Sequence, residues 1–246
     1  LEIAEGFSWP EFTTNGVEGS AFALTNANLI GKAPHILQTA STNFTVEGWI
    51  KVDEDQVHAY ADRYGGPNMP LFEFTQVTTN YWTNIVQIDG EERENIYEYY
   101  TLHRGMSVWL KGNTWTNGYQ RLFPHGSLQV ELGPNSLNGA PVTTFGNLVT
   151  PSGNPSTEDY LNTFTNWLHL AITFSTDEAG DTLKIYSNGE LMLEEQWSHG
   201  FVVPSTGFDF NLGFGHELAY TIGSSQPSYY KGTYTGLMDE FSWYSQ

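Results

Sequence analysis

Short runs of alternating apolar and polar residues recur along this chain, and they constrain its fold more than any other feature. The clearest runs are FTVEGWIKV (44–52), MPLFEF (69–74), GSLQVEL (126–132), WLHLAITFS (167–175) and TLKIYSNGELMLEE (182–195). A period of two directs one side of each run to a core and the other to solvent, as in a β-strand. Gly, Pro, Asn and Ser separate the runs, and long helical patterns are missing. The chain is therefore predicted to be all-β, a sandwich or barrel.

Local signals refine this prediction at three places. Asn188-Gly189 lies between two alternating arms, and this dipeptide tolerates positive φ at both positions, so it predicts a type I′ hairpin. A Ser or Thr cap followed by acidic residues predicts a short helix within 156–164. The aromatic and charged region 85–115 has no clean break, and we interpret it as extra strands or a long hairpin.

Composition limits the classes of partner. The chain has 246 residues, is rich in aromatics and is long enough for one domain spanning 1–246 with a sizeable core. Its formal charge of −19 repels phosphate backbones and anionic lipids, which argues against nucleic acid and membrane partners. No apolar run approaches the roughly 18 residues of a membrane helix. The balance of acidic and neutral polar residues suits an extracellular, cell-surface or virion-surface protein.

The absence of cysteine removes several kinds of chemistry together. With no Cys in the chain, disulfides, thiolate zinc sites and cysteine nucleophiles are excluded. The seven His show no pair at helical or strand spacing that would indicate zinc. An extracellular protein of this composition must be stabilised by its core or by a bound metal.

The segment YTGLMDEFSWYS (234–245) raises a question about burial. In one regular strand, Leu237, Asp239, Phe241 and Trp243 share a face. That face would hold a carboxylate in an apolar row, where an unpaired charge costs several kcal/mol or takes up a proton. Asp239 is therefore expected to have a specific partner.

Four segments, in order, resemble the laminin-G-like (LamG) jelly rolls of the concanavalin A-like lectin/glucanase superfamily. They are NGVEGSAFALTNAN (15–28), STNFTVEGWIKV (41–52), NWLHLAITFSTDEAGDTLKIYSNGELM (166–192) and YTGLMDEFSWYS (234–245). The resemblance implies two antiparallel sheets packed face to face as a jelly-roll sandwich. This superfamily includes lectins, glycosidases, adhesins and virion proteins, so it does not identify a function.

The same resemblance implies a structural calcium ion near the rim of the sandwich. Asp239 of the closing strand would be one ligand, with backbone carbonyls of the opening segment completing the six to eight oxygens that calcium prefers. The usual Asp-Gly of that segment is Thr25-Asn26 here, and Asn26 and Asn28 would offer neutral oxygens instead. The alternative is that Asp239 caps backbone amides of the opening strand without metal.

An enzyme is not expected. Glycosidases need two carboxylates about 5 to 10 Å apart across a sugar bond, and no strand shows the alternating acidic motif that such enzymes of this superfamily usually carry. Two acidic clusters exist, and we interpret them as solvated charge runs: Asp53, Glu54 and Asp55, and Glu91, Glu92 and Glu94. His169 is expected to be structural. The loop STDEAGDT (175–182) is interpreted as a hairpin loop.

Aromatic residues crowd a predicted insertion around 85–120. They are Tyr97, Tyr99, Tyr100, Trp109, Trp115 and Tyr119. Flat rings beside Asn and Gln suit stacking on sugars, so we predict a carbohydrate-binding surface. Two alternatives stay open: alternate members (Tyr97 and Tyr99, or Trp109) belong to the core, or the rings form a protein interface.

The sequence thus favours a non-catalytic, extracellular carbohydrate-binding or adhesion module, stabilised by calcium, with glycans or surface proteins as partners. The alternative is a virion or cell-surface structural protein, such as a capsid decoration, fibre or filament component, that acts through protein–protein contacts. A homo-oligomer or larger assembly fits the second interpretation.

Overall fold

The structure is a computed structural model. It describes residues 11–17, 19–24, 29–32, 43–61, 69–111, 127–132, 142–147, 162–197, 209–219 and 228–245. The first strands are β1 (Glu11–Gly16), β2 (Gly19–Leu24), β3 (Leu29–Lys32), β4 (Phe44–Val52), β5 (Met69–Ile88), β6 (Glu91–Lys111), β7 (Ser127–Leu132) and β8 (Val142–Asn147). The others are β9 (Leu168–Asp177), β10 (Gly180–Ser187), β11 (Glu190–Trp197), β12 (Asp209–Leu212), β13 (Phe214–Ala219), β14 (Ser228–Thr233) and β15 (Gly236–Ser245).

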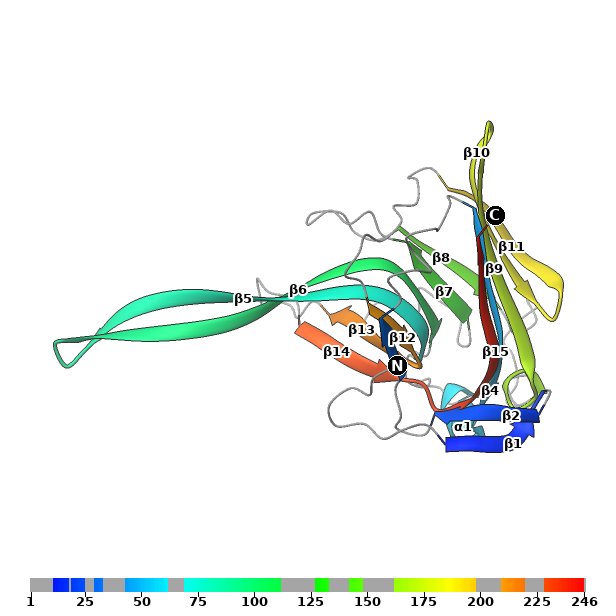
Figure 1. Ribbon diagram of the computed structural model, residues 1–246, viewed down its shortest axis with the longest axis horizontal. Coiled ribbons are helices and arrows are strands. Elements are labelled where there is room, and N and C mark those ends of the chain that lie inside the picture. The colour runs from blue at the N-terminus through cyan, green and yellow to red at the C-terminus, as the bar shows by residue number, and fades with distance from the viewer. Residues whose placement is uncertain are drawn as a thin grey trace.

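The strands form two main antiparallel sheets that face each other (Figure 1). The seven-stranded sheet has the order β1-β2-β15-β4-β9-β10-β11, and the six-stranded sheet has the order β3-β12-β5-β6-β7-β8. Strands β13 and β14 form a separate ribbon. The all-β, two-sheet jelly-roll sandwich predicted from the sequence is confirmed.

The core lies between the two sheets and is made by the inner side of each strand. Along β4 the residues alternate strictly between buried and half-buried positions, as the sequence pattern predicts. Aromatic rings from both sheets meet at one end: Trp243 stacks on Phe44 with ring centroids 4.6 Å apart and meets Phe74 edge-on at 5.1 Å. Each large apolar side chain buried in this way contributes about 1.5–3 kcal/mol.

A long hairpin leaves the sandwich. Strands β5 and β6 pair continuously from Thr75 to Ile88, and Asp89-Gly90 closes the ribbon with φ angles of 56° and 80°. These angles belong to a type I′ turn, so Asp-Gly was the signal for it. Figure 1 shows the distal half projecting far from the body, where it pairs with no other described strand. The interpretation of 85–115 as a long hairpin is confirmed for the described residues to Lys111, and we call residues 80–97 the arm.

Two further turns were predicted correctly from the sequence. Asn188 and Gly189 have φ angles of 49° and 80°, so the predicted type I′ hairpin between β10 and β11 is confirmed. The loop between β9 and β10 is a tight turn in which the Asp177 carboxylate accepts a hydrogen bond from the Ala179 amide at 2.7 Å. The hairpin interpretation of 175–182 is therefore confirmed.

One helix was missed. Helix α1 (Glu54–Ala61) begins where the sequence suggested an acidic loop. Asp53 caps it, because its carboxylate accepts a hydrogen bond from the Asp55 amide at 3.0 Å and its carbonyl accepts from the Val57 amide at 3.1 Å. Val57, within the helix, is fully buried in the core. The three acidic side chains are exposed, so they are solvated as expected, but at a helix N-terminus rather than in a loop.

The helix predicted within 156–164 falls largely outside the described residues. Residues 162–164 are helical, and Phe164 is buried in the core. Within the described part of the chain, no helix is long and apolar enough to cross a bilayer.

Strand β15 contains a bulge that overturns the predicted face of the closing segment. Asp239 pairs with Trp49 and Ser242 pairs with Glu47, so Glu240 and Phe241 together oppose Gly48. The extra residue reverses the alternation. Before the bulge, Met238 faces the core while Leu237 and Asp239 face outward; after it, Phe241 and Trp243 face the core. The expectation that Leu237, Asp239, Phe241 and Trp243 share one face is wrong.

Two residues permit this bulge. Glu240 has a φ of 48°, in the left-handed region that residues other than glycine seldom adopt. Gly48 lies opposite, and a Cβ atom there would lie 3.1 Å from Cδ2 and 3.3 Å from Cα of Phe241. Because Gly48 has no side chain, the bulge can place Phe241 in this space. The Phe241 ring then packs against Phe72 of the facing sheet, with ring centroids 5.1 Å apart.

A buried tyrosine precedes this strand. The Tyr234 side chain is fully buried, and its hydroxyl donates a hydrogen bond to the Leu237 carbonyl at 3.2 Å. Burial raises the pKa of the phenol far above its ordinary value. Gly236 follows with a φ of 151°, and a Cβ there would lie 2.3 Å from the Lys51 carbonyl oxygen. This corner leads the chain into β15, which lies between β2 and β4.

Gly48→Ala tests the close contact at the bulge. The added methyl group forces Phe241 to move, and we expect the free energy of unfolding to fall by about 1–3 kcal/mol, as for other overpacked cores. Urea denaturation measures this loss. Ser175→Ala, at an exposed position of neighbouring β9, is the control and should change the free energy by less than about 0.5 kcal/mol. Equal stability of both variants would contradict the described packing.

Candidate functional site

Asp239 joins two distant parts of the chain. One carboxylate oxygen, Oδ2, accepts a hydrogen bond from the backbone amide of Val17 at 2.7 Å, in the turn after β1. The other, Oδ1, accepts from the amide of Glu240 at 2.9 Å, at the bulge. The residue is 9% exposed and faces away from the inter-sheet core. Its carboxylate therefore has the backbone partners that a buried charge requires, in agreement with the amide-capping alternative.

The predicted calcium ligands are only partly placed. Asn26 and Asn28 lie outside the described residues. Among the residues that the structure does describe, no three His, Asp or Glu side chains gather in a group that would hold a metal. Each oxygen of Asp239 has two lone pairs and uses one on an amide, which leaves one for a cation. Calcium stays a prediction.

One face of the arm combines aromatic rings with amides. Trp82 and Tyr97 are cross-strand partners, and their rings stack with centroids 5.3 Å apart and planes inclined by 29°. The next pair on the same face, two residues toward the tip, is Asn84 and Asn95. Trp82 is 56% exposed and Tyr97 is 48% exposed. We call these four residues the aromatic–amide face.

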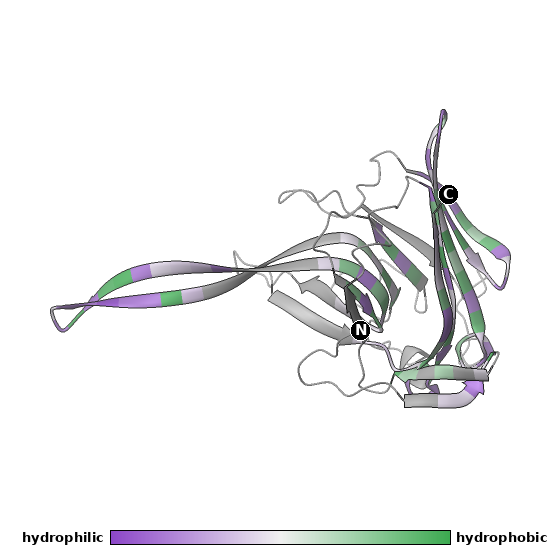
Figure 2. Ribbon diagram, in the orientation of Figure 1, coloured by the Kyte–Doolittle hydropathy of each residue, from purple (hydrophilic) through white to green (hydrophobic). Residues whose placement is uncertain are grey.

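The opposite face of the arm carries exposed apolar side chains, and the β6 residues paired with Tyr81 and Ile85 on that face are Glu98 and Glu94. Tyr81, Ile85 and Ile96 point to this side by strand alternation, and each is more than 60% exposed. Figure 2 shows hydrophobic segments on both strands near the tip of the arm. Exposed apolar groups in such numbers usually mark an interaction surface.

The predicted aromatic cluster is not one surface. Tyr97 lies on the exposed arm, whereas Trp109 lies in the body at 2% exposure, and the two are about 40 Å apart along an extended strand. The Trp109 ring packs beside Gly215 of β13, where a Cβ would lie 2.5 Å from it. Trp109 therefore belongs to the packed interior, in agreement with the core alternative for this residue. The two rings cannot contact one sugar residue.

Four members of that cluster have no described side chain. Tyr99 and Tyr100 belong to β6, but their side chains lie outside the described part. Trp115 and Tyr119 lie outside the described residues altogether. The sequence analysis also missed Trp82, which the Asp-Gly turn would have paired with Tyr97.

A row of buried and half-buried polar residues crosses the outer side of the six-stranded sheet, and it was not predicted from the sequence. Register places Asn211, Glu73, Ser107 and Glu131 side by side on four neighbouring strands. Asn211 donates to Glu73 at 3.1 Å, and Ser107 donates to Glu131 at 3.0 Å. Gln129 also donates to Glu131. A single Glu inside each of the apolar runs LFEF and VEL was the available signal.

This row is an interior network in the described conformation. The two glutamates lie two strands apart, with about 9.5 Å between their Cα atoms, and a pair of carboxylates raises the question of glycosidase chemistry. Glu73 and Ser107 are, however, fully buried, so a substrate does not reach Glu73. The Gln129 Oε1 atom is buried, and no described residue donates a hydrogen bond to it. The row supports the packing of the sheet beneath β13, which contacts β5.

A second small cluster lies on the outer side of the seven-stranded sheet. The Trp49 and His169 rings lie 4.9 Å apart, and the His169 Nε2 atom is 3.6 Å from the Glu47 carboxylate. The His169 amide donates to the Asn188 side chain at 3.0 Å. His169 thus has partners on three sides, in agreement with the expected structural role.

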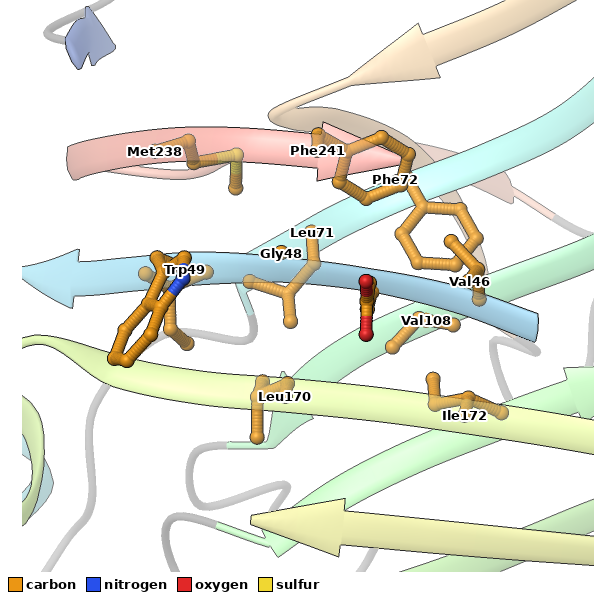
Figure 3. A pocket seen from close by; sticks show the side chains of 12 residues that line it. Val46, Gly48, Trp49, Leu71, Phe72, Val108, Leu170, Ile172, Met238 and Phe241 are labelled. Atoms are coloured by element: carbon orange, nitrogen blue, oxygen red, sulfur yellow. The ribbon is translucent and has the colours of Figure 1, made fainter. Parts of the chain in front are cut away.

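A cavity also exists inside the sandwich. Figure 3 shows Val46, Leu71, Val108, Leu170 and Ile172 facing the same space, and Gly48 borders it without a side chain. Its volume of about 20 Å³ has room for about one water molecule. The apolar lining makes this a packing defect of the core rather than a ligand site.

Comparisons with known proteins support the fold. No protein-family model and no curated protein matches the chain. Among solved structures, it is similar to the receptor-binding domain of a botulinum neurotoxin C/D mosaic serotype, with a TM-score of 0.50 and 14% identity. That match covers 96% of this chain and 41% of the toxin domain. The chain thus spans about two fifths of the length of the toxin domains that it matches.

Two further structures are similar at lower scores. An endo-beta-1,4-glucuronan lyase from the fungus Trichoderma reesei has a TM-score of 0.49 and 11% identity, with 100% of this chain and 90% of the lyase covered. Domain 4 of a GH43 extracellular arabinanase from Geobacillus stearothermophilus, solved with arabinotriose, has a TM-score of 0.45 and 14% identity, with 97% and 76% covered. The toxin-domain match, at 14% identity, supports the fold alone, and membership of the LamG family stays a prediction.

Substitutions at Asp239 test its role in the fold without reference to metal. In excess EDTA, Asp239→Ala leaves two partly buried amides without an acceptor, and we expect a loss of about 1–3 kcal/mol in the free energy of unfolding. Asp239→Asn keeps one acceptor oxygen and should lose less. Glu190→Ala removes one exposed carboxylate and is the control for charge. Denaturant titration gives all three values, and an unchanged Asp239→Ala would exclude the described bridge.

Proposed function

We propose that this protein is a non-catalytic extracellular module that binds glycans through the aromatic–amide face of its arm. The single observation that carries the proposal is the exposed Trp82–Tyr97 stack beside Asn84 and Asn95. The rigid sandwich serves as the base that holds the arm away from the body (Figure 1).

The chemistry of this face suits a sugar. Flat aromatic rings present an apolar surface on which the C–H groups of a pyranose stack. Amide side chains both donate and accept hydrogen bonds, as hydroxyl groups require. The chain as a whole is acidic, and acidic residues also outnumber basic ones in the arm, so neutral glycans fit better than anionic ones.

A glycan array with and without millimolar calcium tests the proposal. Wild-type protein should bind a defined set of glycans, and Trp82→Ala together with Tyr97→Ala should weaken binding by about tenfold or more, through the loss of stacking area. The melting temperature should stay unchanged, because both rings are on the exposed arm. Tyr244→Ala removes a ring of 50% exposure from the body and is the matched control.

Two outcomes would contradict the proposal. Undiminished binding by the Trp82/Tyr97 double variant would place the glycan site elsewhere. The absence of glycan binding with calcium and with EDTA would exclude the glycan proposal and favour the second candidate function.

The second candidate is a virion or cell-surface structural protein that acts through protein–protein contacts. Two isoleucines of the arm favour it, because the branched aliphatic side chains of Ile85 and Ile96 are more than 60% exposed and do not stack on sugars. Exposed apolar groups of this kind are normally covered in an assembly.

Calcium stabilisation is a separate part of the proposal. If Asp239 contributes a ligand, excess EDTA should lower the melting temperature by about 5 °C relative to millimolar calcium, because a ligand that binds only the native state stabilises it. Asp239→Ala should remove this difference. Differential scanning fluorimetry measures both proteins, and equal melting of wild type in the two buffers would exclude a stabilising calcium ion.

A further inference from the structure

The two strands of the arm differ in charge. From Gln76 to Ile88, β5 contains no charged residue and no proline. The paired segment of β6 from Glu91 to Glu98 carries four acidic residues and one arginine. One long edge of the ribbon is therefore neutral and the other is acidic.

The neutral edge is open and regular. Strand β12 pairs with β5 at Phe72–Thr75, and along 81–88 the described part of the chain offers β5 no strand partner except β6. Pairing with β6 runs from Thr75 to Ile88 without a register shift, so no bulge twists this edge away. The backbone groups on the far side of β5 are thus arranged to pair with another strand.

Natural proteins usually protect such an edge. Charged side chains, proline and bulges on an edge strand prevent pairing with other chains. The acidic residues give β6 this protection, and β5 lacks every one of these devices over thirteen residues. An isolated two-stranded ribbon is also only marginally stable, whereas a sheet of three or more strands with an apolar face is stable.

We propose that β5 pairs with β5 of a second copy of this chain, antiparallel, to form a four-stranded sheet from two arms. A two-fold axis at Asn84 brings Trp82 of one copy opposite Val86 of the other, and Thr83 opposite Ile85. Aromatic and β-branched residues form favourable cross-strand pairs. The interface is isologous, because the same edge serves both copies, and the assembly closes as a dimer.

Charge selects this partner and this edge. Each copy carries a formal charge of −19, so two copies approach most easily where charge is absent. In the order β6-β5-β5-β6 the two acidic strands lie on the outside, about 14 Å apart. That separation exceeds the Debye length of about 8 Å at physiological salt, so their repulsion is largely screened.

The dimer goes beyond the proposed glycan binding and does not depend on it. Edge pairing uses backbone groups, whereas the aromatic–amide face uses side chains on one side of the sheet. A two-fold axis perpendicular to the sheet places the aromatic–amide faces of both copies on the same side. The paired arms then present two adjacent sugar-binding surfaces.

Two isoleucines on the same face of the arm provide a matched test. Ile85 lies on β5 at 63% exposure and Ile96 lies on β6 at 65% exposure. In the proposed dimer, Ile85→Lys places two lysines on diagonal positions across the new interface, with about 7–8 Å between their Cα atoms. Ile96→Lys adds the same charge one strand farther from the axis.

Analytical ultracentrifugation over a concentration series at physiological salt gives the dissociation constant of the dimer. Wild type should sediment as a dimer, Ile85→Lys should raise the dissociation constant by about tenfold or more, and Ile96→Lys should change it by less than about threefold. Thr83→Lys, also on β5, should resemble Ile85→Lys. Circular dichroism verifies that each variant keeps its strand content.

Hydrogen exchange locates the interface. Amides within 81–88 should become protected as wild-type concentration rises through the dissociation constant, while amides within 91–97 should not. A monomer at every concentration would overturn the proposal. Equal weakening by both isoleucine variants would also overturn it, because it would indicate packing through the face of the arm that holds Ile85 and Ile96. The glycan array tests the proposed glycan binding separately from the dimer. A protein that binds glycans but stays monomeric would contradict only the dimer.

Discussion

The hydrogen bonds of the Asp239 carboxylate and the bulge beside it determine how this sandwich closes. Strand β15 lies between β2 and β4, so the last strand of the chain joins the first strands to the rest of the seven-stranded sheet. The bulge at Glu240 turns Phe241 and Trp243 into the core while Asp239 stays outside. The carboxylate then bonds the amides of Glu240 and Val17, which fixes both the bulge and the opening turn.

The sandwich and the arm differ in how far their apolar side chains are buried. In the body, aromatic and aliphatic side chains of two sheets bury one another, and even polar residues such as Glu73 have buried partners. In the arm, β5 and β6 pair with each other and with no other described strand, and large apolar groups are exposed on both faces. A core explains the first arrangement, and the second is the reason for proposing that the arm binds a partner.

Prediction from the sequence succeeded where local chemistry decides the structure. Alternation identified β4 with its correct bounds, and Asn188-Gly189 identified its hairpin, because side-chain period and positive φ are properties of a few adjacent residues. Prediction failed where the local structure depends on a residue of another strand. The bulge in β15 depends on Gly48, and the buried contacts of Trp109 depend on Gly215, both distant in sequence. The short helix α1 was missed although its cap, Asp53, was visible.

The sequence by itself determined the all-β class, the turns, the acidic character of the chain and the lack of thiol chemistry, since each depends on composition or on neighbouring residues. Only the tertiary structure decided that Tyr97 and Trp109 belong to different environments, although both lie on β6. A strand as long as β6 passes from the packed body into solvent. Its side chains alternate between the two faces in the same way in both parts, so the sequence pattern does not distinguish them. Which part is covered depends on the strands that pair beside it, and these are set by contacts between segments far apart in the chain.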